Sequence, residues 1–222
     1  AVAGQIRARA VEGLQLFNGE IPAQGQRRVQ RRAAVPLGEH EAVALGQADI
    51  TFSASLQLYR TDSEEIAAEC ALGSEMPYDI AFVTDSVVCA VSEGRVRFFA
   101  ADGTERGAYV AENGRIADYH FGGDGFVTVL VDPYETSSRA ELITLQPDGS
   151  VLAQLSLGFM PVSLSACGSY VGILTAEKAL LYTSALEPVA QTEQDGTAVC
   201  ILARSDGTAL LAGTGTASLF LP

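Results

Sequence analysis

Two histidines, His40 and His120, are the only imidazole groups with which this chain could build a hydrolytic site. His40 lies in a loop-like segment, and His120 ends an apolar run, where such a side chain usually makes ordinary hydrogen bonds. The sequence has no G-x-S-x-G elbow, no Walker loop and no H-E-x-x-H motif. The glycine-rich run 122–125 precedes no helix and is typical of a hairpin. These patterns identify no catalytic residue, no cofactor and no metal site.

Aspartates recur in the turns between the first two apolar runs of successive repeats. They are Asp49, Asp85, Asp124 and Asp206. If the repeats form a ring, these carboxylates would share one face, where they could bind a cation. The remaining repeat has Gly168 and Ser169 at this position, which breaks the ring. An aspartate in a turn commonly bonds its own backbone two residues on, and we favour this capping role.

An insertion from Asp132 to Arg139 separates the second and third apolar runs of one repeat. Loops at this position share a face with the crossovers between repeats, where ligands and partners commonly dock. Tyrosine and arginine are enriched at binding hot spots. We predict Asp132, Tyr134, Glu135 and Arg139 as binding residues, with an ordinary solvated loop as the alternative.

The net charge of −13 opposes binding to the phosphates of nucleic acid and to anionic lipid. Against this background, arginines gather in one short segment, at Arg27, Arg28, Arg31 and Arg32. Such a cluster can bind a polyanion or an acidic partner, but an exposed edge strand or a linker also explains it. We expect a protein or a small ligand as the partner, and neither nucleic acid nor bare membrane.

The four cysteines are Cys70, Cys89, Cys167 and Cys200. They show no C-x-x-C pair and no histidines at metal-ligand spacing, so we expect free thiols, with a disulfide as the alternative. Cys89 and Cys200 lie in apolar runs, where a free cysteine behaves as a small buried hydrophobe. Runs such as 126–131 are far shorter than the roughly 20 residues of a membrane-spanning helix. The sequence starts without Met or a leader, so we expect a processed piece whose targeting segment is absent.

The elements that must position these residues repeat with a period of about 40 residues. Residues 42–69 match residues 79–109 element by element, and the same order recurs at 116–157, 162–193 and 199–221. Pro36, Pro77 and Pro161 stand just before first runs, where a fixed φ and a missing N–H suit a crossover outside a sheet.

The runs are predicted to be strands, because Asp-Gly and Asn-Gly pairs supply the positive φ angles that tight hairpins need. Four pairs fall between runs: Asp102-Gly103, Asp124-Gly125, Asp148-Gly149 and Asp206-Gly207. Two fall in crossovers: Asn113-Gly114 and Asp195-Gly196. The runs are rich in Val, Ile, Leu, Phe and Tyr, and none shows sustained helical periodicity.

Four strands per repeat at this period predict an all-β fold, a β-propeller of four-stranded antiparallel blades. We predict one domain, 1–222, with about six blades, the first and last incomplete. The predicted blades are 5–35 (partial), 42–72, 80–110, 116–157, 162–193 and 199–221 (partial). First strands such as 80–83 and 199–202 are nearly all apolar, as expected between neighbouring blades. Outer strands such as 104–110 are more polar, as expected of a solvated edge.

The chain resembles a family of bacterial proteins of unknown function in which a membrane helix precedes an extracytoplasmic WD40-like propeller. The resemblance rests on the Leu-Gln-Leu-Tyr strand 56–59, the Pro77 and Pro161 crossovers and the Val-x-Ile-Leu-Thr run 171–175, and it covers about residues 36–190. It implies a location outside the cytoplasm and an anchor in a segment absent from this sequence, but no activity. The chain departs from the family in lacking the membrane helix, and it lacks the Trp-Asp and Gly-His dipeptides of typical WD40 repeats.

We therefore expect a non-enzymatic propeller that recognises a protein or a small ligand through its loops. This expectation rests on fold and on the missing catalytic patterns. One rival is a propeller lyase or glycan hydrolase, which would need two carboxylates converging within roughly 5 to 10 Å. Another is a structural scaffold of an envelope assembly, which would carry a broad exposed apolar patch.

Overall fold

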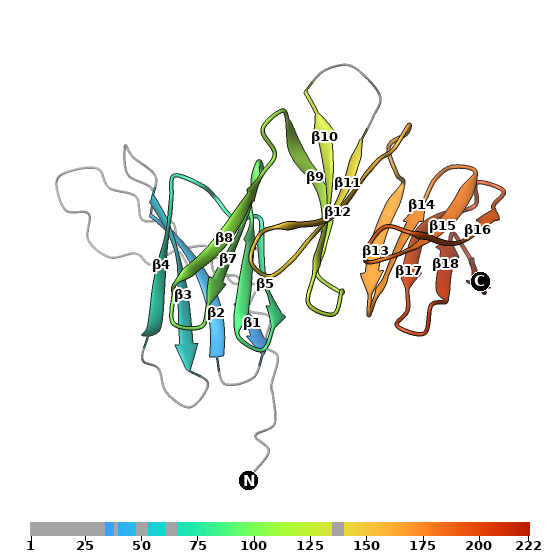
Figure 1. The fold of residues 1–222 in the computed structure, drawn as a ribbon. Coiled ribbons are helices and arrows are strands. Elements are labelled where there is room, and N and C mark those ends of the chain that lie inside the picture. Colours follow the sequence, from blue (N-terminus) through green and yellow to red (C-terminus); the bar gives the residue numbers. More distant parts are fainter. Residues whose placement is uncertain (1–33, 38–39, 48–52, 61–65, 135–139) are drawn as a thin grey trace, which may run out of the picture. The chain divides into compact units, whose positions relative to one another are not determined.

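The computed structural model describes residues 34–37, 40–47, 53–60, 66–134 and 140–222, and every regular element in them is a β-strand. Consecutive strands pair to form separate sheets (Figure 1). The chain divides into two compact units, Ala1–Gly107 and Ala108–Pro222. In the described part of the chain, no helix has the length and apolar character needed to cross a membrane.

Unit 1 contains two four-stranded sheets. The first sheet consists of β1 (Ala34–Leu37), β2 (His40–Gln47), β3 (Ser53–Arg60) and β4 (Ile66–Gly73). The second consists of β5 (Asp79–Thr84), β6 (Val87–Val91), β7 (Arg95–Ala100) and β8 (Glu105–Val110), and the unit boundary falls within β8. Alternate side chains of β3, including Leu56 and Leu58, pack with Ile80, Phe82 and Phe99 of the second sheet. This buried apolar cluster stabilises unit 1.

Unit 2 contains three sheets. The third sheet of the chain consists of β9 (Gly114–His120), β10 (Val127–Pro133), β11 (Glu141–Leu145) and β12 (Val151–Ser156). The fourth consists of β13 (Ser163–Cys167), β14 (Tyr170–Leu174), β15 (Lys178–Thr183) and β16 (Pro188–Glu193). The fifth has three strands, β17 (Ala198–Ala203), β18 (Ala209–Gly213) and β19 (Thr216–Phe220). One apolar cluster joins the third and fourth sheets, and another joins the fourth and fifth.

The predicted four-stranded unit is confirmed in four sheets, and the fifth sheet ends after its third strand as predicted. The first sheet differs, because the predicted blade 42–72 begins at Ala34 and residues 40–47 form its second strand. Pro36 thus lies within β1 and not before it. Since β1 is an edge strand, proline is tolerated there. Residues 5–33 of the predicted partial blade 5–35 lie outside the described residues, and a single domain over 1–222 stays a prediction.

Four hairpins use the predicted Asp-Gly chemistry. Their glycines have positive φ: Gly103 (86°), Gly125 (73°), Gly149 (81°) and Gly207 (82°). In the turns of Gly103, Gly149 and Gly207 the preceding aspartate accepts a hydrogen bond from the N–H two residues on, at Thr104, Ser150 and Thr208. Each of these turns therefore fixes its geometry with its own residues.

For β17, the described residues cover one face of the strand. Val199 and Leu202 are exposed, whereas Ile201 and Ala203 are buried. The described residues cover only one face of this sheet.

All four cysteines are free, and burial raises the pKa of Cys70 to about 11. Cys89 is buried as predicted, whereas Cys200 on β17 is only partly buried.

Candidate functional site

The predicted recognition loop leaves the third sheet at the end of β10 and returns at β11, between the second and third strands as predicted. Asp132 lies within β10, opposite Arg115 of β9 in the ladder. Its Oδ2 accepts hydrogen bonds from Nη2 and Nε of Arg115, at 3.1 and 3.3 Å. Asp132 therefore anchors the base of the loop. Because the pair is largely exposed, it contributes at most about 1 kcal/mol to stability.

The crossover before β9 supports the same loop. The N–H of Tyr134 donates to the carbonyl oxygen of Asn113 at 3.0 Å. A Cβ on Gly114 would lie 2.6 Å from the carbonyl oxygen of Asp132, so this close approach needs glycine. Gly114 does not have the positive φ expected of an Asn-Gly turn. The crossover and the loop thus share one hydrogen-bonded base.

Tyr134 has a hydrogen-bonded backbone N–H, and the residue is 67% exposed. A tyrosine ring offers apolar area and a hydroxyl group at a low cost in side-chain entropy, which suits recognition. Of the four predicted binding residues, the structure brings Asp132 and Tyr134 to the loop base, and Glu135 and Arg139 lie outside the described residues. Sequence reasoning missed the supporting Arg115, although an arginine and an aspartate near the ends of successive strands are a weak signal for such a pair.

His120 occupies the opposite end of β9 and has a structural role. Its Nδ1 accepts a hydrogen bond from the N–H of Gly122 at 3.0 Å. The following turn reaches the fourth sheet, where the N–H of Asp124 donates to the carbonyl oxygen of Gly168 at 2.8 Å. Partial burial lowers the pKa of His120 below its ordinary value, and the Asp118 carboxylate opposes this shift. His120 therefore makes the ordinary hydrogen bond of a strand end.

We expect the free energy of unfolding to fall as the pH drops below 6.5, the ordinary pKa of this side chain. The folded pKa is lowered, so the unfolded chain takes up the proton first. The stabilisation is then complete above the unfolded pKa and is lost as the pH falls toward the folded one. Chemical denaturation between about pH 8 and pH 5 measures this slope. His120→Asn keeps a hydrogen-bond acceptor for Gly122 and should flatten the slope of stability against pH. An unchanged slope in this variant would mean that another group causes the pH dependence.

The acidic turns show capping at Asp206, whose Oδ1 accepts from the N–H and hydroxyl of Thr208 at 3.0 and 2.7 Å. In the turn that contains Asp85, the Thr84 hydroxyl accepts from a backbone N–H instead. The prediction that Asp49 joins first and second strands is wrong, because Asp49 follows β2, the second strand, and lies outside the described residues. Over the parts of the chain that the structure describes, no group of three His, Cys, Asp or Glu side chains is placed to hold a metal ion.

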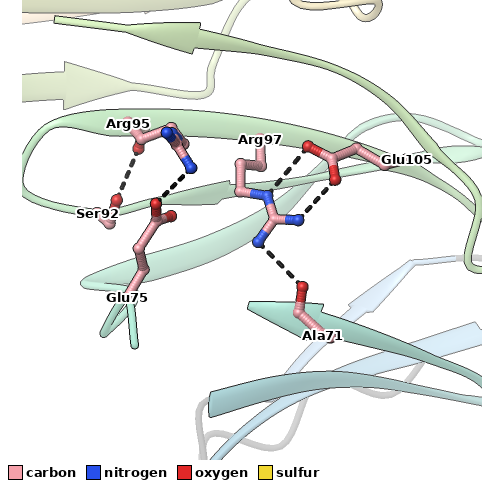
Figure 2. A network of polar contacts seen from close by, with 6 residues as sticks. All are labelled: Ala71, Glu75, Ser92, Arg95, Arg97 and Glu105. Carbon is pink, nitrogen blue, oxygen red and sulfur yellow. Dashed lines mark hydrogen bonds and ion pairs between the residues drawn. The ribbon is translucent and has the colours of Figure 1, made fainter. Parts of the chain in front are cut away.

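A polar cluster in unit 1 links its two sheets (Figure 2). Arg97 of β7 donates from Nε and Nη2 to the two oxygens of Glu105 on β8, at 3.1 and 2.6 Å. Its Nη1 donates to the carbonyl oxygen of Ala71 on β4 at 3.0 Å. The guanidinium carbon lies 5.0 Å from the centre of the Phe99 ring. Because these contacts occupy the guanidinium on three sides, the cluster is a structural link and not a ligand site.

A small cavity beside this cluster has a volume of about 10 Å³, room for about one water. Its lining includes one carboxylate, Glu75, which forms an ion pair with Arg95 at 2.6 Å. A hydrolase of the rival kind needs two carboxylates and space for a sugar. This cavity therefore does not support the enzyme hypothesis.

Comparison of the sequence with protein-family models and with curated proteins gives no match. The structure is similar to solved structures. The C-terminal WD40 domain of Sif2 matches with a TM-score of 0.56 and 11% identity over 83% of this chain and 55% of that one. A eukaryotic initiation factor matches with a TM-score of 0.63 and 11% identity over 87% and 53%. BBS1N in complex with ARL6DN matches with a TM-score of 0.51 and 13% identity over 85% and 74%.

These likenesses show the fold alone. The sheets are blades of a WD40-like β-propeller, so the predicted fold class is confirmed. The chain spans about half the length of the first two structures it matches.

Proposed function

We propose that this protein is a non-enzymatic propeller module that recognises a protein or a small ligand through the β10–β11 loop and the crossover beside it. The observation that carries this proposal is the exposed Tyr134, whose backbone N–H is hydrogen-bonded to the carbonyl oxygen of Asn113. Since Asn113 and Gly114 already hold the loop base, a partner would pay less conformational entropy on binding than with a free loop.

One of the matched structures bears on the proposed recognition role. One matched structure is BBS1N in complex with ARL6DN, so a similar fold occurs in a protein complex. That binding belongs to BBS1N. For this chain it supports only the idea that a propeller of this kind can serve recognition.

Tyr134→Ala tests the proposal. We expect it to weaken capture of a purified partner about tenfold or more, as loss of an aromatic anchor does. Tyr78→Ala is the matched control, because Tyr78 is also exposed (53%) but lies in unit 1. The chain has no tryptophan, so Tyr134→Trp provides a single fluorescent reporter for titration. Equal affinities of the two alanine variants would contradict the proposal.

We also propose an extracytoplasmic location with a membrane anchor outside this sequence. Its support is the resemblance to the membrane-anchored family. Protease treatment of intact and permeabilised cells that express the natural full-length protein tests it. Cleavage without permeabilisation of the cytoplasmic membrane is expected, and protection equal to that of a cytoplasmic marker would contradict it.

A further inference from the structure

The first strands of the three sheets in unit 2, β9, β13 and β17, run parallel. A parallel bridge joins the turns that follow β9 and β13. Between β13 and β17, the N–H groups of Ile201 and Ala203 donate to the hydroxyl oxygens of Ser163 and Ser165, in the same order along both strands. The starts of these strands therefore lie at one end of unit 2, together with the crossovers, the β10–β11 loop and the β14–β15 turn.

This end of unit 2 carries the exposed apolar residues of its linking segments. Tyr134 is 67% exposed, Met160 is 47% exposed and Val162 is 53% exposed. We call these three residues the crossover face. The turns at the other end expose no large apolar residue; they are 121–126, 146–150, 168–169, 184–187 and 204–208. Apolar exposure is thus confined to one end of the linking segments that the structure describes, as expected of an interaction surface.

The crossover that carries Met160 and Val162 is held on both sides of the methionine. Before it, Phe159 packs against the apolar cluster of the third and fourth sheets. After it, the N–H of Val162 donates to the carbonyl oxygen of Leu174 at 2.7 Å. Pro161 between them has a restricted φ. A partner therefore meets side chains on a supported backbone, and the unbranched thioether of Met160 adapts to apolar surfaces of varied shape.

The charged side chains at the same end are mainly acidic. Both of its basic residues in the described part of the chain already face a carboxylate. Arg115 binds Asp132, and Lys178 lies opposite Glu193 in the ladder. Three further acidic residues are exposed there: Glu112, Glu177 and Asp195. The surroundings of the crossover face therefore favour a partner with positive charge.

We propose that the crossover face binds a protein segment that combines apolar side chains with lysine or arginine. This inference rests on the proposed recognition role of the β10–β11 loop and names the class of partner. Apolar side chains of the segment pack on Tyr134, Met160 and Val162, and its basic side chains are attracted by the carboxylates around them. A small ligand would instead need a concave site that buries most of its surface. Each residue of the crossover face is at least 47% exposed, which suits a larger partner.

Panning of a phage-displayed library of random peptides on the immobilised 222-residue chain tests the class of partner. We expect the enriched peptides to carry Lys or Arg among Leu, Ile, Phe or Met. The most enriched peptide is then synthesised with a fluorescent label, and its affinity is measured by fluorescence anisotropy. Added salt should weaken binding, because it screens the attraction between the basic peptide and the acidic face.

Two pairs of variants locate the binding surface. Met160→Ser should weaken binding of the selected peptide about tenfold. Leu152→Ser is its control, since Leu152 is 40% exposed on β12 and lies toward the other end. Glu177→Lys should weaken binding about fivefold, whereas Glu187→Lys, in an exposed turn at the other end, should not. Circular dichroism checks that all variants are folded.

The variants separate this inference from the recognition role on which it rests. Binding that is lost in Tyr134→Ala but unchanged in Met160→Ser and Glu177→Lys would overturn the inference and leave the recognition role standing. Binding that is unchanged in all three variants would contradict the recognition role itself. Enrichment of acidic peptides, or of no peptide, would also overturn the inference.

Discussion

Replacing Arg97 with methionine is expected to lower the free energy of unfolding by about 2–3 kcal/mol. The methionine retains apolar contact with Phe99, but it removes the two bonds to Glu105 and the bond to the Ala71 carbonyl oxygen. The arginine side chain is only 14% exposed, so water replaces these bonds poorly. Chemical denaturation at neutral pH measures the loss.

The free energy of unfolding at acidic pH tests the pairing of Arg97 with Glu105 independently. The hydrogen bond from Arg97 holds the pKa of Glu105 below its ordinary value of 4.5. This contribution is therefore complete above the unfolded pKa and is lost as the pH falls through the folded one. Arg97→Met should remove the part of the stability loss at low pH that comes from protonation of Glu105. Arg95→Met, whose ion pair with Glu75 is more exposed, should cost no more than about 1 kcal/mol. Equal costs for the two variants would contradict the structural role of Arg97.

Leu181→Ala should destabilise the chain by about 3 kcal/mol, because the side chain is fully buried between the fourth and fifth sheets. Leu219→Ala, at the equivalent position of the last sheet, should cost less than about 1 kcal/mol, because Leu219 is 50% exposed. Denaturation of both variants at one low protein concentration makes the comparison. A Leu219→Ala cost equal to that of Leu181→Ala would contradict the exposed position of Leu219.

Most strands from Asp79 onward could be predicted from the sequence, because turn chemistry and apolar runs act over short distances. The second sheet, predicted at 80–110, spans 79–110, and the fourth, predicted at 162–193, spans 163–193. The start of the first sheet could not be predicted. Pro36 suits either a crossover or an edge strand, and only pairing with β2 distinguishes them.

The position of the β10–β11 loop could be predicted from the sequence, but the contacts at its base could not. An insertion between two strands is visible in the sequence, whereas the pairing of Arg115 with Asp132 depends on a bulge between Leu130 and Val131. A bulge shifts the register by one residue and leaves no clear sequence mark. The exposure of Leu202 could not be predicted either, because an apolar strand has the same sequence pattern whether one or both of its faces are covered.

The ladders of the described strands join neighbours along the chain, at hairpins such as the one closed by Asp206 and Gly207. Closing such short loops costs little chain entropy, and a fold rich in local pairings reaches its native topology faster than a β-sandwich of crossed connections. Each blade can thus pair its strands as soon as its own stretch of chain has left the ribosome. We expect the docking of one blade on the next to follow the pairing of strands within each blade.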